Sequence, residues 1–247
     1  MCPINTIKMP VFSIIYIFLF FTRSVLTFQS SSQNVITTQT RNKNTHDSIS
    51  VLFMSNKNIM ANGSSNMPLL TTKYQPSRPN SCTYWVTPNI LAGEYPTSKL
   101  GTDEVRVRLN QYVEKGITFF IDLTQEGEKD AYESILLEEA NKLSSSVSYK
   151  RLPVQDFGIP KKYQMKIILD TIDDAIRNNN KVYVHCRGEI GRTGTTVGCF
   201  LVRHGYTGIE ALEEVNRLFQ FSDRSMESSY SPETKAQVNF VTYWNED

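Results

Sequence analysis

Two short, nearly continuous apolar segments constrain the fold of this chain most strongly. Residues 117–123 read Ile-Thr-Phe-Phe-Ile-Asp-Leu, and residues 181–185 read Lys-Val-Tyr-Val-His. The first segment is a continuous apolar run typical of a strand buried on both faces, and the second is predicted to be another strand. Because helical patterns lie around and between them, the sequence predicts an α/β domain with a central, mainly parallel sheet flanked by helices.

The surrounding pattern predicts the other elements of a domain that spans residues 81–247. Short strands are expected at residues 84–86 and 148–152. Helices are expected at residues 102–116, 131–143, 160–178 and 197–202, then after a capping box at Thr207 and Glu210, and finally from Pro232 as a first helical residue. Ligands of such sheets bind beside the carboxyl ends of the strands, so the loops that follow residues 152 and 185 are the expected functional loops.

The helix expected to start at Pro160 has an apolar stripe that predicts its buried face. Its members are Ile167, Ile168, Ile172, Ala175 and Ile176.

The first 80 residues differ in composition from the expected domain. Val11–Phe21 is an apolar run between Lys8 and Arg23, and it is shorter than the ~20 residues that span a bilayer. Residues 1–27 are therefore predicted to be a cleaved signal peptide, with a signal anchor or a buried helix as the alternative. Residues 28–80 are rich in Ser, Thr, Asn and Gln, which predicts a disordered, transit-like or linker segment.

The two N-terminal segments together resemble the bipartite plastid presequence of algae with complex plastids. Phe28 would be the aromatic residue at the junction. The resemblance implies a plastid location, and a secreted or endomembrane-anchored protein is the alternative.

Composition argues against several classes of function. The net charge is +1, which gives no indication of nucleic-acid binding. The 4 cysteines are widely separated and only 3 histidines are present, so a disulfide framework and a metal site are not expected. No cofactor and no stable membrane span are expected either.

The loop that follows the strand ending at His185 is the strongest functional signal. A strand–loop–helix turn of this kind directs backbone N–H groups inward, and the helix N-terminus adds partial positive charge. Gly188 and Gly191 are expected to adopt backbone angles that other residues avoid. Arg192 is placed to bind two oxygens of a dianion. The loop therefore predicts a site for a tetrahedral oxyanion, formed by Arg187, Gly188, Glu189, Ile190, Gly191 and Arg192.

Cys186 stands where the strand ends and this loop begins. The dipoles that bind phosphate also stabilise a thiolate, and the thiolate is the nucleophilic form of cysteine. The hydroxyl of Thr193 is expected to donate to the sulfur, and His185 to support the loop through hydrogen bonds. Asp156, in the loop after the strand at residues 148–152, is the candidate for protonating a leaving group and then activating water.

At these residues the chain resembles the cysteine-dependent protein tyrosine phosphatase superfamily, in its dual-specificity-like branch. The superfamily motif is His-Cys, five residues, then Arg-Ser/Thr, which corresponds here to His185, Cys186, Arg192 and Thr193. The resemblance extends over residues 82–247. It implies Cys186 as the nucleophile, Arg192 as the phosphate clamp and Asp156 as the general acid, without a metal.

Glu189 departs from this resemblance, because the family usually has glycine at that position. A positive φ would strain a glutamate there, and a carboxylate ~4 Å from the dianion would repel it by about 4 kcal/mol at a dielectric constant of ~20. Two hypotheses follow. The first is a phosphatase of phosphotyrosine, and also of phosphoserine or phosphothreonine, in proteins. The second is a phosphate-binding pseudophosphatase impaired by Glu189, and a phosphoinositide or phosphoglucan substrate is a further alternative.

Overall fold

The computed structural model describes residues 75–97 and 100–247. The expected signal-peptide and transit-like segments, residues 1–27 and most of residues 28–80, lie outside the described residues. Ordered contacts begin before residue 81: the buried side-chain amide of Gln75 donates to the carbonyl of Trp85 and accepts from its N–H. No helix in the described ranges is long and apolar enough to cross a membrane.

A five-stranded sheet forms the centre of the domain. In spatial order its strands are β1 (Thr83–Thr87), β2 (Ile90–Gly93), β5 (Lys181–His185), β3 (Ile117–Asp122) and β4 (Ser148–Arg151). Only the β1–β2 pair is antiparallel, and the other pairs are parallel. The predicted α/β fold with a mainly parallel sheet is confirmed.

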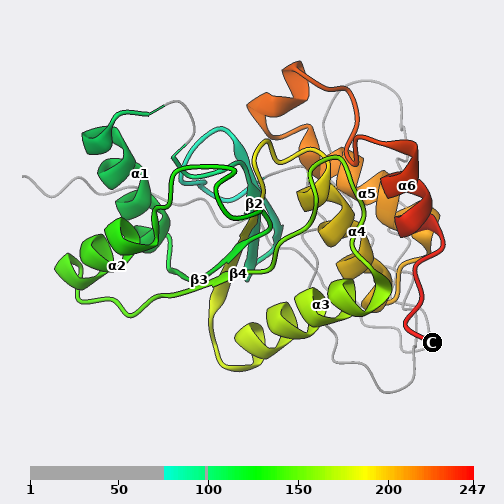
Figure 1. Ribbon diagram of the computed structural model, residues 1–247, viewed down its shortest axis with the longest axis horizontal. Helices are drawn as coiled ribbons and strands as arrows, with labels where there is room; N and C mark the ends of the chain where they lie inside the picture. Colours follow the sequence, from blue (N-terminus) through cyan, green and yellow to red (C-terminus); the bar gives the residue numbers. More distant parts are fainter. Residues whose placement is uncertain (1–74, 98–99) are drawn as a thin grey trace, which may run out of the picture. The chain divides into compact units, whose positions relative to one another are not determined.

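Helices cover both faces of this sheet (Figure 1). On one face, α1 (Thr102–Glu114) and α2 (Glu133–Lys142) pack on a core that includes Tyr112, Phe120 and Tyr183. On the other face lie α3 (Lys162–Arg177), α4 (Arg192–Arg203), α5 (Gly208–Phe219) and α6 (Lys235–Thr242), and the short 3-10 helix η1 (Asp223–Met226) follows α5. The central strands β3 and β5 are thus covered by helices on both faces, which agrees with their apolar sequences.

Helix boundaries follow their caps, and three expectations are corrected. Thr207 and Glu210 form the predicted capping box of α5, with the Glu210 N–H donating to Thr207 Oγ1. By contrast, α6 begins after Thr234, whose side chain caps it, and not at Pro232. Helix α4 begins at Arg192, earlier than the predicted start at Val197.

The third correction concerns the buried face of α3. Ile168, Leu169 and Ile172 are buried as part of the core, whereas Ile167 is 47% exposed. The apolar residues of this helix therefore occupy two faces, and only one of them packs against the sheet.

Candidate active site

Three loops leave the same edge of the sheet and meet there. The parallel register places Asp122 of β3 beside both Arg151 of β4 and His185 of β5. The segments that follow these strands, residues 123–132, 152–161 and 186–191, therefore start side by side. This is the edge at which parallel sheets bind ligands.

The segment from Cys186 to Gly191 is the phosphate loop of the sequence prediction, and this name is kept below. It runs from the end of β5 into the N-terminus of α4, and Cys186 is only 3% exposed. Within the described part of the chain, the N–H groups of residues 187–191 donate to no protein acceptor. Five backbone donors and the positive end of a helix dipole thus remain available to an anion.

Close packing, and not an unusual backbone, explains the two glycines of the phosphate loop. The positive φ values recorded for glycines in the described residues belong to positions outside this loop. A Cβ at Gly188 would lie 3.0 Å from Nη2 of Arg224, and one at Gly191 would lie 2.9 Å from Nε2 of Gln237. The prediction that both glycines need special angles is wrong. They allow two supporting side chains to approach the loop closely.

Glu189 has a positive φ of 71°, which is a strained conformation for a glutamate. Its side chain is fully buried and does not line the pocket, so the predicted repulsion of a bound dianion does not arise. The hydroxyl of Ser222 donates to Glu189 Oε2 at 2.8 Å. Burial raises the pKa of Glu189 well above its usual value, which favours the neutral carboxyl. Glu189 thus anchors the phosphate loop to the segment after α5.

Three more contacts fix this loop from outside. Arg224 Nε donates to the carbonyl of Gly188 at 3.3 Å, and the hydroxyl of Ser231 donates to the carbonyl of Ile190 at 2.7 Å. The N–H of Tyr95, after β2, donates to the carbonyl of Arg187 at 3.3 Å. Three carbonyls of the loop are therefore hydrogen-bonded to segments outside it before any ligand binds, which preorganises the loop.

Arg192, the first residue of α4, is 3% exposed and surrounded by acceptors. Its two terminal nitrogens bind both oxygens of Glu128, at 2.8 and 2.5 Å, and Nη1 also donates to the carbonyl of Val154 at 3.1 Å. Burial raises the pKa of Glu128, but the hydrogen bonds from Arg192 outweigh it and hold that pKa below its usual range. Glu128 therefore fixes the plane of the guanidinium.

Asp156 reaches the same guanidinium from the loop after β4. Its Oδ1 lies 2.9 Å from Arg192 Nη2, and its Oδ2 lies 3.9 Å from Nη1 of Arg187. Its side chain is 36% exposed, so the carboxyl group is accessible from the pocket. The next residue, Phe157, is 61% exposed at a φ of 57°.

The two predicted supporting residues differ in what they contact. His185 is fully buried, shares a 2.6 Å hydrogen bond with the hydroxyl of Tyr132, and has its pKa lowered to about 4 by burial, so its imidazole is neutral. Thr193 is also fully buried, but its hydroxyl has no hydrogen-bond partner among the described residues. The structure therefore records no bond from Thr193 to the sulfur.

Gln237 of α6 connects two of the loops. It is fully buried, and its Nε2 donates to the carbonyl of Gly158 at 3.0 Å while its side chain lies against Gly191. Its Oε1 accepts from the N–H groups of Glu233 and Thr234. One amide thus joins the loop that carries Asp156, the phosphate loop and the start of α6.

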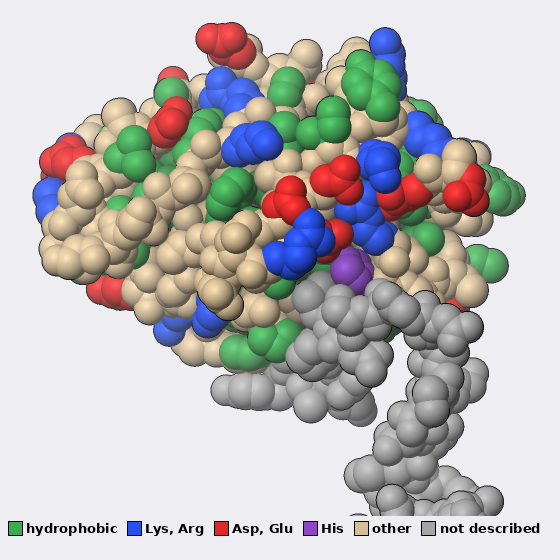
Figure 2. Space-filling view, turned by 90° about the horizontal axis from the view of Figure 1, so that it is seen from below, with side chains coloured by type: hydrophobic (Ala, Val, Ile, Leu, Met, Phe, Trp, Pro, Cys, Tyr) green, Lys and Arg blue, Asp and Glu red, His purple; other side chains and the backbone are tan. Residues whose placement is uncertain are grey.

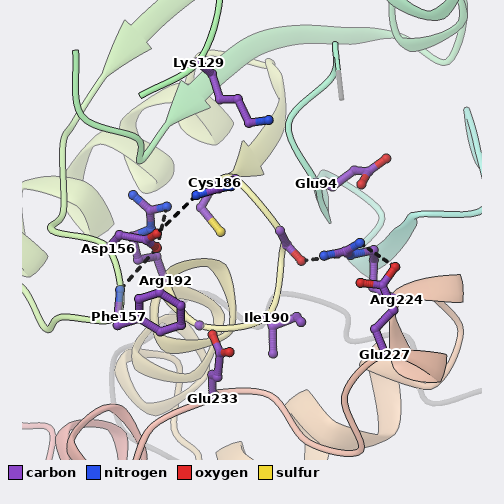
Figure 3. Close-up of a pocket in the computed structure, with 13 residues that line it drawn as sticks. Glu94, Lys129, Asp156, Phe157, Cys186, Ile190, Arg192, Arg224, Glu227 and Glu233 are labelled. Atoms are coloured by element: carbon purple, nitrogen blue, oxygen red, sulfur yellow. Dashed lines mark hydrogen bonds and ion pairs between the residues drawn. The ribbon is translucent and has the colours of Figure 1, made fainter. Parts of the chain in front are cut away.

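These groups surround a pocket of about 420 Å³, shown in Figure 3. Cys186, Arg192 and Asp156 lie together on one side of it, and the side chain of Lys129 extends above them. The lining residues are Glu94, Lys129, Asp156, Phe157, Cys186, Arg187, Gly188, Ile190, Gly191, Arg192, Arg224, Glu227 and Glu233. The predicted anion-binding residues therefore meet in one cavity, except for the side chain of Glu189.

Such a cavity can bind a tetrahedral dianion and present it to a sulfur nucleophile. Glu128, Gln237, Lys129 and Arg224 are parts of this site that no sequence motif indicates. The bidentate contact of Glu128 with Arg192 spans 64 positions and leaves no local signal.

Comparison with known proteins agrees with this geometry. Residues 96–206 match the family model described as "Polymorphic toxin system, DSP-PTPase phosphatase". The "Protein tyrosine phosphatase domain-containing protein 1" of Mus musculus is 29% identical over 125 residues, which are 48% of this chain and 16% of that protein. The "Putative tyrosine phosphatase 067L" of Invertebrate iridescent virus 3 is 25% identical over 126 residues, which are 49% of this chain and 46% of that protein. This chain thus spans less than half the length of either relative.

Among solved structures, the core catalytic domain of the PP-IP phosphatase SIW14 from S. cerevisiae matches with a TM-score of 0.51 and 13% identity. The match covers 70% of this chain and 90% of that one. At this identity the likeness concerns the fold alone.

Proposed function

This chain belongs to the cysteine-dependent protein tyrosine phosphatase superfamily, in its dual-specificity-like branch, and we propose that it hydrolyses phosphomonoesters on protein side chains through a cysteinyl-phosphate intermediate. One observation carries the proposal. Cys186 lines a pocket beside a loop with five N–H groups that have no acceptor among the described residues, and beside a buried arginine that is paired at 2.9 Å with a partly exposed aspartate.

The first chemical step is attack by the Cys186 thiolate on phosphorus. The new S–P bond forms as the P–O bond to the leaving group breaks. The N–H groups of the phosphate loop and the guanidinium of Arg192 stabilise the equatorial oxygens in the transition state. Asp156, when protonated, gives its proton to the departing alkoxide or phenoxide.

The second step returns the enzyme to its starting form. The Asp156 carboxylate accepts a proton from water, and the hydroxide equivalent attacks phosphorus. The S–P bond breaks, inorganic phosphate leaves, and the thiolate is regenerated. Atoms and charges balance without a metal or a redox partner in these steps.

The pairing of Arg192 with Asp156 describes the resting site. A phosphate dianion is the stronger partner for a guanidinium, so binding of substrate replaces the Asp156 contact on Arg192. Glu128 keeps its bidentate hold during this exchange, because Glu128 does not line the pocket that the substrate enters. The carboxyl group of Asp156 is then placed beside the bound ester.

Protein side chains are the substrate class that we favour. Both curated relatives are named as tyrosine phosphatases, and the apolar side chains of Phe157 and Ile190 line the pocket mouth, where the group carrying the phosphate would pass. Lys129 and Arg187 favour a second candidate, an inositol phosphate or phosphoinositide, since both cations line the same mouth. The pseudophosphatase alternative loses its main argument, because Glu189 points away from the pocket.

A substrate panel tests the proposal. The full chain is assayed with an aryl phosphate, phosphotyrosine and phosphoserine peptides, a soluble inositol polyphosphate and phosphoinositide micelles. We expect metal-independent hydrolysis of the aryl phosphate, inhibition by vanadate, and a higher kcat/KM for phosphopeptides than for either inositol substrate. Phosphate binding without turnover of any substrate would instead support the pseudophosphatase hypothesis.

A further inference from the structure

An apolar strip leads away from the mouth of the active site. It consists of Phe157 and Ile159 in the loop after β4, and of Tyr163 and Ile167 on α3; we call these four residues the outer strip. They are exposed by 61%, 44%, 58% and 47%, respectively. Phe157 also lines the pocket, so one end of the outer strip lies at the site.

Core packing does not account for these side chains. Helix α3 already buries a full face against the sheet through residues such as Met165, Leu169 and Ile172. Ile167 was expected on that face, yet it lies outside it. Phe157 is an aromatic residue held exposed at a positive φ, a conformation that costs free energy and that proteins keep mainly at functional sites. Ile167, which lies outside the buried face, and Phe157, which is exposed at a positive φ, both belong to the outer strip.

We propose that the outer strip binds the polypeptide next to the phosphorylated residue of a protein substrate. This inference rests on the proposed function. Tyr163 and Ile167 are four residues apart on a helix, a separation of about 6 Å. Alternate residues of an extended peptide lie on one side at about 6.6 Å. The strip therefore fits an extended chain whose apolar residues occupy every second position beside the phosphorylated residue.

Charges around the strip favour a polypeptide over a membrane surface. Lys162 and Lys166 bind C-terminal residues of the chain, including Asn245 and Glu246, and Lys161 lies over the ring of Tyr163. Further along α3, Asp170 and Asp174 are paired with Arg203 and Arg177, so this part of the helix offers no excess positive charge that would attract an anionic bilayer. On the face shown in Figure 2, basic side chains are interspersed with acidic and hydrophobic ones.

The test is a paired-substrate assay with the full chain. Two phosphotyrosine peptides carry apolar residues at alternate positions, one before and one after the phosphotyrosine, and matched peptides carry serine at those positions. The test variant is Tyr163→Gln/Ile167→Gln, which leaves Phe157 and the pocket intact. The control is Val107→Gln/Ile209→Gln, which removes two apolar side chains that are at least as exposed, one from α1 and one from α5.

The wild type and the control should prefer one apolar peptide over its serine counterpart by about tenfold in kcat/KM, mainly through KM. The test variant should lose this preference, while all three proteins hydrolyse p-nitrophenyl phosphate equally. A preference that survives in the test variant, or that is absent from the wild type, would overturn the inference.

Other outcomes separate this inference from the proposed function. Hydrolysis of p-nitrophenyl phosphate but of no peptide would remove the protein-substrate proposal, and the docking role with it. Hydrolysis of peptides without any apolar preference would remove the docking role alone. Two outcomes with the peptide preference intact would assign the strip to a different occupant. Loss of binding to phosphatidylcholine–phosphatidylserine vesicles would indicate a membrane, and a change from dimer to monomer would indicate a second copy of the chain.

Discussion

The phosphate loop and the loop after β4 leave the same sheet edge on either side of β3, yet they are built in opposite ways. In the first, Cys186 and Glu189 are buried, and contacts from outside the loop hold its carbonyls and one of its side chains. In the second, Phe157 and Ile159 are exposed, and Asp156 is partly exposed. The comparison shows a division of labour. In the proposed mechanism, the anchored phosphate loop binds the phosphate, and the loop after β4 supplies the proton and contacts the group that carries the phosphate.

The largest loss of activity is expected from a substitution in the phosphate loop. Cys186→Ser replaces the nucleophile with a much weaker one and should lower kcat on the order of 10⁴-fold or more. Binding of a phosphopeptide should persist, because the backbone donors and Arg192 remain. Steady-state assays and calorimetric titration measure the two quantities, and loss of binding together with turnover would mean that the sulfur also maintains the loop.

A smaller loss of activity, which depends on the substrate, is expected from a substitution in the loop after β4. Asp156→Asn keeps the shape of the side chain but removes the acid, so kcat should fall by about 10²- to 10⁴-fold for esters with poor leaving groups. For an aryl phosphate with a strongly acidic phenol the decrease should be much less, because that leaving group needs no proton. A plot of log kcat against leaving-group pKa checks this. If kcat fell by the same factor for every leaving group, Asp156 would not be the general acid.

Gln237 allows the coupling between the two loops to be tested. Gln237→Met fills the same space without hydrogen bonds, and the groups left unpaired should cost about 1–3 kcal/mol of stability. Because Gly158 loses its anchor, activity on poor leaving groups should fall more than activity on good ones. Asn239→Met, at an exposed position of the same helix, is the control and should change neither quantity.

The smallest effect on catalysis is expected at Glu189. Its pKa is raised in the folded chain, so wild-type stability falls as the pH rises above the ordinary value of 4.5 and the unfolded chain releases the proton. Glu189→Gln does not titrate, so its stability relative to the wild type should increase from pH 5 to pH 8. Denaturant unfolding at both pH values measures the difference, and kcat should remain within about twofold because no transition-state contact is removed. A large gain in kcat would restore the repulsion hypothesis.

Local patterns predicted the fold and the residues that define the site. Apolar runs located β3 and β5, and the residues that follow the strands pointed to Cys186, Arg192 and Asp156. These predictions depend on periodicity and on strand–loop–helix order, which a single sequence displays. The caps of α5 were equally local and were placed correctly.

The remainder of the site depends on contacts between distant segments. Glu128 reaches Arg192 across 64 positions, and Gln237 reaches Gly158 across 79. The direction of the Glu189 side chain depends on Ser222, which no local pattern places nearby. Ile167 was misassigned because the apolar pattern of α3 covers two faces, and periodicity alone does not say which one meets the sheet.

Trapping the covalent intermediate tests the central claim most directly. The wild type and Cys186→Ser are mixed with excess phosphotyrosine peptide, quenched in acid within milliseconds, digested and examined by mass spectrometry. The account predicts that the wild-type peptide containing Cys186 gains one phosphoryl group, and that the variant gains none at this position. Rapid phosphate release with Cys186 never modified, or undiminished turnover by Cys186→Ser, would contradict it.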